Sequence, residues 1–70
     1  MSATITVKTS KGEQKKVKLS LTDTIGKAKE MSGEKGATWK FGGSLLEDNK
    51  KVMDYFLETG DVIDSTKGSG

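Results

Sequence analysis

Two runs of alternating apolar and polar residues near the N-terminus constrain the fold of this chain more than any other feature. In residues 3–7 (ATITV) the apolar side chains recur at every second position, and in residues 17–21 (VKLSL) they do so again. This period of two is typical of a β-strand with one buried face. Because residues 10–13 (SKGE) have the composition of a turn, the sequence predicts an antiparallel hairpin with one apolar face.

The periodicity changes after the predicted hairpin. Residues 22–24 (TDT) offer side-chain oxygens that can cap a helix, and Gly33 offers a stop signal. Between them the apolar residues recur at three-residue steps, at Ile25, Ala28 and Met31. This spacing predicts a helix over residues 25–31 with those three side chains facing inward. A helix of this length is not stable alone, and we therefore expect it to pack on the hairpin. Gly26 should weaken the helix by about 1 kcal/mol relative to Ala.

The second half of the chain predicts three further strands. The candidates are residues 38–41, residues 44–46 and residues 61–66. Trp39 and Phe41 share one face of the first candidate, and a Gly-Gly turn separates it from the second. Residues 52–57 (VMDYFL) have the character of a short turn or 3₁₀ segment that carries several apolar side chains.

The predicted order is strand, strand, helix, strand, strand, turn, strand, which indicates an α+β domain with a helix packed on a sheet. We expect the domain to span residues 1–66 and to be followed by a flexible Gly/Ser tail at residues 67–70. No apolar run approaches the roughly 18 residues of a membrane-spanning helix, and the first residues (MSAT) do not resemble a secretory signal. We therefore expect a monomer in the cytoplasm or the nucleus, without membrane contact.

The chain lacks the residues on which most catalytic and metal sites depend. Its 70 residues include no Cys, His, Arg or Pro. Without Cys and His there is no thiolate nucleophile, no zinc site of the common kinds and no imidazole base. The carboxylates between residues 54 and 64 do not have the spacing of a calcium loop, so we interpret them as a solvated acidic face. We expect no enzyme activity, no bound metal and no cofactor.

Charge is distributed unevenly along the chain, although the net charge is only +2. Residues 1–20 contain five Lys and one Glu, whereas residues 45–64 contain six acidic residues and two Lys. The two segments are either ordinary solvated surfaces or a pair of opposed docking faces. The basic side chains that could form a nucleic-acid face are Lys8, Lys11, Lys15, Lys16 and Lys18. Since no aromatic residue is interleaved with them for base stacking, we do not expect nucleic-acid binding.

Several short motifs, in matching order, resemble the ubiquitin-like family. They are residues 5–9 (ITVKT) with Gly12, residues 23–25 (DTI), residues 41–48 (FGGSLLED) and residues 54–55 (DY). The resemblance implies a β-grasp fold, in which a mixed sheet of four to five strands packs on one helix, and this agrees with the predicted element order. Residues 23–26 together with Trp39 are also similar to a non-conjugated ubiquitin-like protein that binds splicing factors.

The resemblance also implies candidate docking residues. At the positions of the family's apolar recognition patch this chain carries Ser10, Lys40 and Thr66, so the candidate docking surface, which includes Lys8, is polar. Generic ubiquitin-binding domains would have to desolvate Lys40, and we expect them to bind weakly. Of the lysines through which ubiquitin forms chains, only two have a counterpart here, at Lys8 and Lys29, and Ser44 and Thr59 occupy the places of the two most used. The resemblance therefore does not imply ubiquitin-like chain signalling.

Two further residues are candidates for contact with other proteins. Ubiquitin-like modifiers are attached through a C-terminal Gly, and this chain ends in Ser69-Gly70 rather than Gly-Gly. A single terminal Gly is used by the ubiquitin-fold modifier family, so Gly70 is either a conjugation carboxyl or part of a flexible tail. Tyr55 and Phe56 are adjacent and cannot both face inward, so one of them should be exposed, and Phe56 is the second candidate contact.

The resemblance implies a small β-grasp protein that acts through protein–protein contacts and has no catalytic role. One hypothesis is a protein modifier that forms an isopeptide bond through Gly70, with activating and conjugating enzymes as partners. The alternative is a non-covalent interaction module of the splicing-factor-binding type, for which Gly70 has no role. A sulfur carrier of the same fold would need a terminal Gly-Gly, which Ser69 disrupts.

Overall fold

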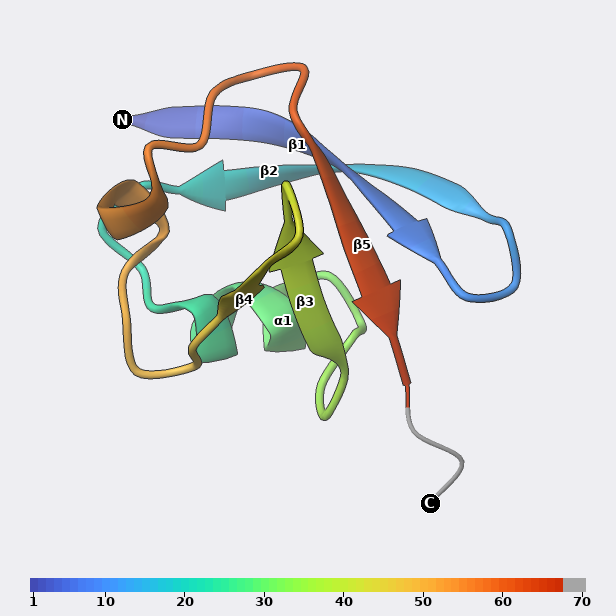
Figure 1. The fold of residues 1–70 in the computed structure, drawn as a ribbon. Helices are drawn as coiled ribbons and strands as arrows, with labels where there is room; N and C mark the ends of the chain where they lie inside the picture. The colour runs from blue at the N-terminus through green and yellow to red at the C-terminus, as the bar shows by residue number, and fades with distance from the viewer. Residues whose placement is uncertain (68–70) are drawn as a thin grey trace.

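A computed structural model of the protein describes residues 1–67. It contains a five-stranded mixed sheet, one α-helix and one 3₁₀-helix (Figure 1). The elements in chain order are β1 (Ser2–Thr9), β2 (Gln14–Ser20), α1 (Ile25–Met31), β3 (Thr38–Phe41), β4 (Ser44–Leu46), the 3₁₀-helix η1 (Val52–Tyr55) and β5 (Val62–Thr66). This arrangement confirms the α+β, β-grasp fold expected from the sequence. No helix within residues 1–67 is long and apolar enough to cross a membrane.

The sheet places the first and last strands side by side at its centre. The strand order is β2-β1-β5-β3-β4, with β1 parallel to β5 and every other neighbouring pair antiparallel. The predicted hairpin forms, with Ile5 opposite Val17 and Ala3 opposite Leu19. Its turn includes Gly12 at a φ of 88°, a conformation that Gly adopts without strain. Helix α1 lies against one face of this sheet (Figure 1).

Helix α1 spans the residues that the sequence predicts, but its inward face differs from the prediction. The side-chain oxygen of Thr24 caps it by accepting an N–H of the first turn at 3.2 Å. Met31, which we predicted to face inward, is 67% exposed, whereas Lys29 is only 5% exposed. A helix turns by about 100° per residue, so three-residue steps drift by about 60° each. Met31 therefore lies about 120° from Ile25 around the helix, while Lys29 lies about 40° from it.

The start of α1 is joined closely to the segment that follows β4. The N–H of Ile25 donates to the carbonyl oxygen of Lys50 at 2.7 Å, and the N–H of Gly26 donates to that of Asp48 at 3.0 Å. A Cβ atom at Gly26 would lie 3.3 Å from the Asp48 carbonyl oxygen. Glycine at this position is therefore more than a weak point of the helix, because it allows two backbone segments to approach each other.

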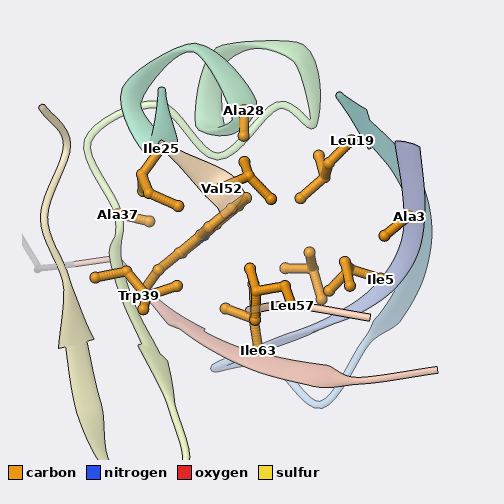
Figure 2. Packing of buried hydrophobic residues seen from close by; sticks show 12 residues of the cluster. Ala3, Ile5, Leu19, Ile25, Ala28, Ala37, Trp39, Val52, Leu57 and Ile63 are labelled. Carbon is orange, nitrogen blue, oxygen red and sulfur yellow. The ribbon is translucent and has the colours of Figure 1, made fainter. Parts of the chain in front are cut away.

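The core lies between α1 and the covered face of the sheet (Figure 2). Trp39 from β3 is its largest side chain and is fully buried, reaching across the cluster toward Val52. The other buried apolar residues are Ala3, Ile5, Val7, Leu19, Ile25, Ala28, Ala37, Leu46, Leu57 and Ile63. Strands β1, β3 and β5 each supply inward side chains at alternate positions, so the intervening residues project from the opposite, outer face of the sheet.

Candidate functional site

Three charged side chains form a row across the middle of the outer face. Lys8 on β1 lies opposite Asp64 on β5, and Asp64 lies opposite Lys40 on β3. All three are exposed. Because neighbouring strands are about 4.8 Å apart, the Cα atoms of Lys8 and Lys40 are about 10 Å apart, with Asp64 between them. We call Lys8, Asp64 and Lys40 the charged row.

The charged row is bordered by threonines and by two partly exposed apolar side chains. Thr66 lies opposite Thr38 at one end of β5, and Val62 lies opposite Thr6 at the other end. Leu45 on β4 extends the row beyond Lys40. Val62 and Leu45 each expose about half of their surface. This surface can therefore make ionic contacts at its centre and limited apolar contacts at its margins.

The structure brings together three of the four predicted docking residues. Lys8, Lys40 and Thr66 project from the same outer face, on three adjacent strands. Ser10 lies beyond the end of β1, in the turn that leads to β2. It lines a polar hollow of about 330 Å³ that Ser65 and Lys67 also line, at the end of β5. Ser10 thus borders the end of the sheet rather than the charged row.

A buried polar network lies beneath this end of the sheet. The indole Nε1–H of Trp39 donates to Ser65 Oγ at 2.9 Å, and the Ser65 hydroxyl donates to Glu34 Oε1 at 2.7 Å. The Lys15 ammonium donates to the other Glu34 oxygen at 2.7 Å and to the Ser32 carbonyl oxygen at 3.3 Å. The hydrogen bond from Lys15, aided by that from Ser65 and opposed by burial, lowers the pKa of Glu34 below its ordinary value. The network joins β2, β3 and β5 to the loop after α1.

Sequence reasoning missed this network, although two positions signalled it. Ser65 follows Ile63 by two residues and therefore occupies an inward position of β5, and Lys15 occupies an inward position of β2. A polar side chain at an inward position of a strand needs a buried partner. Because Glu34 lies in a loop, no periodic pattern indicated that it would be that partner. The same geometry removes Lys15 from the predicted basic face, of which Lys8, Lys16 and Lys18 remain on the outer side.

The two lysines that match chain-forming positions of ubiquitin have different environments. Lys8 is exposed on the outer face. Lys29 is buried in α1, and its ammonium pairs with the Asp48 carboxylate at 2.5 Å. An amine that is buried and hydrogen-bonded in this way is not accessible to an activated carboxyl of another molecule. Lys8 is therefore the accessible member of the pair.

Two of the acidic residues between 54 and 64 cap the turns in which they lie. Asp54 accepts the backbone N–H of Lys51 at 2.8 Å, and Asp61 accepts that of Glu58 at 2.8 Å. Within residues 1–67 no group of three or more His, Cys, Asp and Glu side chains is placed to hold a metal ion. We find no arrangement of these carboxylates that indicates metal chemistry.

The predicted exposure of one member of the Tyr55–Phe56 pair is confirmed. Tyr55 turns inward, and its hydroxyl accepts the N–H of Glu47 at 2.9 Å, whereas Phe56 is 86% exposed. Phe56 follows η1, and η1 lies near the start of β1 (Figure 1), whereas Lys8 is the last residue but one of β1. The structure therefore separates Phe56 from the charged row. Gly70, the predicted conjugation residue, lies outside the described residues.

Comparison with known proteins gives matches at the level of structure. No protein-family model and no curated protein matches the sequence. A protein designed de novo on the basis of ubiquitin matches with 24% identity and a TM-score of 0.78, over 99% of this chain and 92% of that chain. The ubiquitin-like domain of Plasmodium falciparum Dsk2 matches with 18% identity and a TM-score of 0.87, over 97% of this chain and 100% of that chain.

A third solved structure is the C-terminal ubiquitin-like domain of the human 2'-5'-oligoadenylate synthetase-like protein, p59 OASL. It has 17% identity and a TM-score of 0.79, over 99% of this chain and 86% of that chain. The similarity therefore extends over almost the whole chain, whereas the identities are low. Together with the sheet order and the single helix, these likenesses show that the chain has the ubiquitin-like β-grasp fold.

Proposed function

We propose that the protein is a non-covalent protein-interaction module that docks its partners on the outer face of the sheet. The observation that carries this proposal is the charged row. Its three side chains are exposed on the three neighbouring strands β1, β5 and β3. The two ion pairs found within residues 1–67 join Lys15 to Glu34 and Lys29 to Asp48, so neither neutralises the row.

The solved structures of the same fold support this proposal. Two of them are named as domains of larger proteins, Dsk2 and the oligoadenylate synthetase-like protein, rather than as free modifiers. A domain of this kind acts through the surface that it presents to other proteins. In this chain that surface includes the outer face of the sheet, where the charged row lies.

The chemistry of the charged row defines the partner that it fits. A complementary surface would place carboxylates opposite Lys8 and Lys40, about 10 Å apart, and a hydrogen-bond donor or cation opposite Asp64. Leu45 and Val62 would add apolar contacts at the margins. Nucleic acid fits less well, because the outer face of the sheet carries no aromatic side chain on which bases could stack.

Charge reversal tests the proposed docking face. Immobilised wild-type protein and the Lys40→Glu variant would be compared for capture of proteins from a lysate of the natural source. Lys27→Glu, at an exposed position of α1 away from the sheet, is the matched control for net charge. A captured protein would then be produced pure and titrated against each variant.

We expect Lys40→Glu to weaken binding of that protein by about tenfold or more, since a like-charge contact replaces an attractive one. Lys27→Glu should bind as the wild type does, and higher salt should weaken the wild-type complex. Equal binding by the wild type and Lys40→Glu would contradict the proposal, as would an equal loss in both variants.

The covalent alternative rests on Gly70 in the sequence and is tested separately. The full chain and a chain lacking Gly70 would each be incubated with ATP and the same lysate. Adducts of higher mass that require Gly70 would identify a modifier. Unchanged partner binding without such adducts would support the non-covalent module.

A further inference from the structure

Phe56 combines two unusual properties. It is 86% exposed, and its backbone has a φ of 54° and a ψ of 40°. Residues with bulky side chains rarely adopt this left-handed conformation, which Gly and Asn accept more easily. Within residues 1–67 it is the one residue other than Gly with a positive φ. Folding alone would favour a smaller or more polar residue here.

The backbone conformation of Phe56 follows from its anchored neighbours. Tyr55 is held by the hydrogen bond from Glu47, and Leu57 is buried in the core. The N–H of Phe56 donates to the carbonyl oxygen of Met53 at 3.1 Å, which closes η1. The chain must therefore reverse at Phe56, and the aromatic ring points to solvent. The fold requires the turn but does not require the ring.

An apolar hollow lies directly beside this ring. Its volume is about 340 Å³, and its lining residues are Leu21, Met53, Phe56, Leu57 and Glu58. The N–H of Met53 donates to the Leu21 carbonyl oxygen at 3.0 Å, which holds η1 against the end of β2. Met53 is itself 44% exposed. We call these five residues the Phe56 groove.

The charged side chain that lines the Phe56 groove is Glu58. The Asp61 carboxylate lies beside it, because it accepts the backbone N–H of Glu58 at 2.8 Å. Asp54 and Lys51 lie at the other end of η1, where the Asp54 carboxylate accepts the backbone N–H of Lys51 at 2.8 Å. An occupant of this groove would therefore meet an apolar floor and an acidic rim.

We propose that the Phe56 groove binds a short peptide segment of a partner protein that carries one or two large apolar side chains flanked by Lys or Arg. The apolar side chains would contact Phe56 and Met53, and the cations would face the acidic rim. Met side chains adapt to the shape of an occupant, and an exposed aromatic residue is a common binding hot spot.

The size and charge of the groove favour this occupant over two others. A stable dimer buries roughly 800 Å² on each partner, far more than a groove lined by five residues offers. An anionic membrane surface would be repelled by the acidic rim. This binding site is distinct from the charged row and does not depend on the function proposed for it.

A synthetic peptide provides the probe. A twelve-residue peptide with two Leu at its centre and Lys on both sides would be titrated into the ¹⁵N-labelled protein with labelled Met methyl groups and followed by NMR. A second peptide with Glu in place of every Lys is the control for charge. Phe56→Asn removes the ring and retains a residue that accepts the left-handed conformation, so this variant should fold. Met31→Ser, at an exposed apolar position on α1, is the matched protein control.

We expect the Lys peptide to shift the resonances of Leu21, Met53 and residues 56–58, and Phe56→Asn to weaken this binding by about tenfold or more. Met31→Ser should leave it unchanged, and the Glu peptide should not bind. Several outcomes would overturn the proposal: no shifts at millimolar peptide, shifts confined to other surfaces, equal binding by Phe56→Asn, or equal binding of the Glu peptide. Resonance shifts of these residues that depend on protein concentration in the absence of peptide would show that a second copy of the chain occupies the groove. Binding of anionic lipid vesicles that requires Phe56 would show that the groove contacts a membrane. Either result would also overturn the proposal.

Discussion

Replacing Ser65 with Ala should destabilise the protein by about 2 kcal/mol, although it removes a single oxygen atom. The Ser65 hydroxyl is fully buried and belongs to two hydrogen bonds at once. It accepts the indole N–H of Trp39 at 2.9 Å and donates to the Glu34 carboxylate at 2.7 Å. Ala at this position would break both hydrogen bonds and offer no replacement.

The magnitude follows from the groups that would be left behind. Trp39 is fully buried, so its N–H would lose its partner without access to water, which costs about 1–3 kcal/mol. Glu34 would keep its hydrogen bond from Lys15 at 2.7 Å, so its carboxylate would not be left without a donor. We therefore expect a loss near the middle of that range, about 2 kcal/mol, or roughly 30-fold in the unfolding equilibrium. A core of this size supplies only about 3–5 kcal/mol, so the variant should fold but lose about half of its stability.

Urea denaturation followed by the fluorescence of Trp39, the only Trp of the chain, would measure this loss. The indole N–H resonance should also shift in the variant, because its acceptor is gone. Ser44→Ala, at an exposed position of β4, is the matched control and should change stability by less than about 0.5 kcal/mol. A free energy of unfolding for Ser65→Ala within about 0.5 kcal/mol of the wild type would refute the reasoning, as would an equal loss in Ser44→Ala.

Three further predictions follow from other buried contacts. Lys15 lowers the pKa of Glu34 in the folded protein below its ordinary value of 4.5. The Glu34 carboxylate therefore stabilises the fold fully at pH values above its ordinary pKa, and this contribution is lost as the pH falls through the lowered pKa. In urea titrations at neutral and acidic pH, the free energy of unfolding should depend less on pH for Glu34→Gln than for the wild type, and an identical dependence would contradict this. Asp48→Ala should lower the free energy of unfolding by about 1–2 kcal/mol, because the Lys29 ammonium would remain buried without its carboxylate partner. Lys29→Met removes the buried charge as well, so it should change the free energy of unfolding by less than about 1 kcal/mol. A larger loss for Lys29→Met than for Asp48→Ala in chemical denaturation would contradict this. Gly26→Ala should destabilise the protein by about 1 kcal/mol despite the higher helix propensity of Ala, because the new Cβ would lie 3.3 Å from the Asp48 carbonyl oxygen. Thermal denaturation would measure this loss, and a melting temperature above that of the wild type would contradict the prediction.

The elements with a local pattern could be predicted from the sequence. The hairpin follows from the period-two runs, and the bounds of α1 follow from the capping oxygen of Thr24 and the stop near Gly33. The parallel pairing of β1 with β5 could not be read in this way, because it joins segments more than fifty residues apart and neither strand carries a signal for its neighbour. The inward face of α1 was predicted only in part, since the steps of three that end at Met31 depart from the true helical period.

The candidate site likewise includes residues that could be predicted from the sequence and residues that could not. Lys8, Lys40 and Thr66 could be placed on one surface through the resemblance to ubiquitin, and alternation along each strand agrees with that placement. Asp64 was missed as the centre of the row, because its place between the two lysines depends on the register of three strands. The hollow beside Phe56 was also missed, since it forms only when η1 packs against the end of β2.

The buried network and the outer charged row are linked through the register of β5. Ser65 lies directly opposite Trp39, so their side-chain hydrogen bond joins the same two residues that the backbone ladder pairs. A slip of β5 by one residue would turn Ser65 toward solvent and bury Asp64, leaving an unpaired carboxylate in the core and an indole N–H without an acceptor. The network therefore selects the one register in which Asp64 lies between Lys8 and Lys40. The interior hydrogen bond to Ser65 thus determines not only how stable the sheet is but also which charges its outer face presents to a partner.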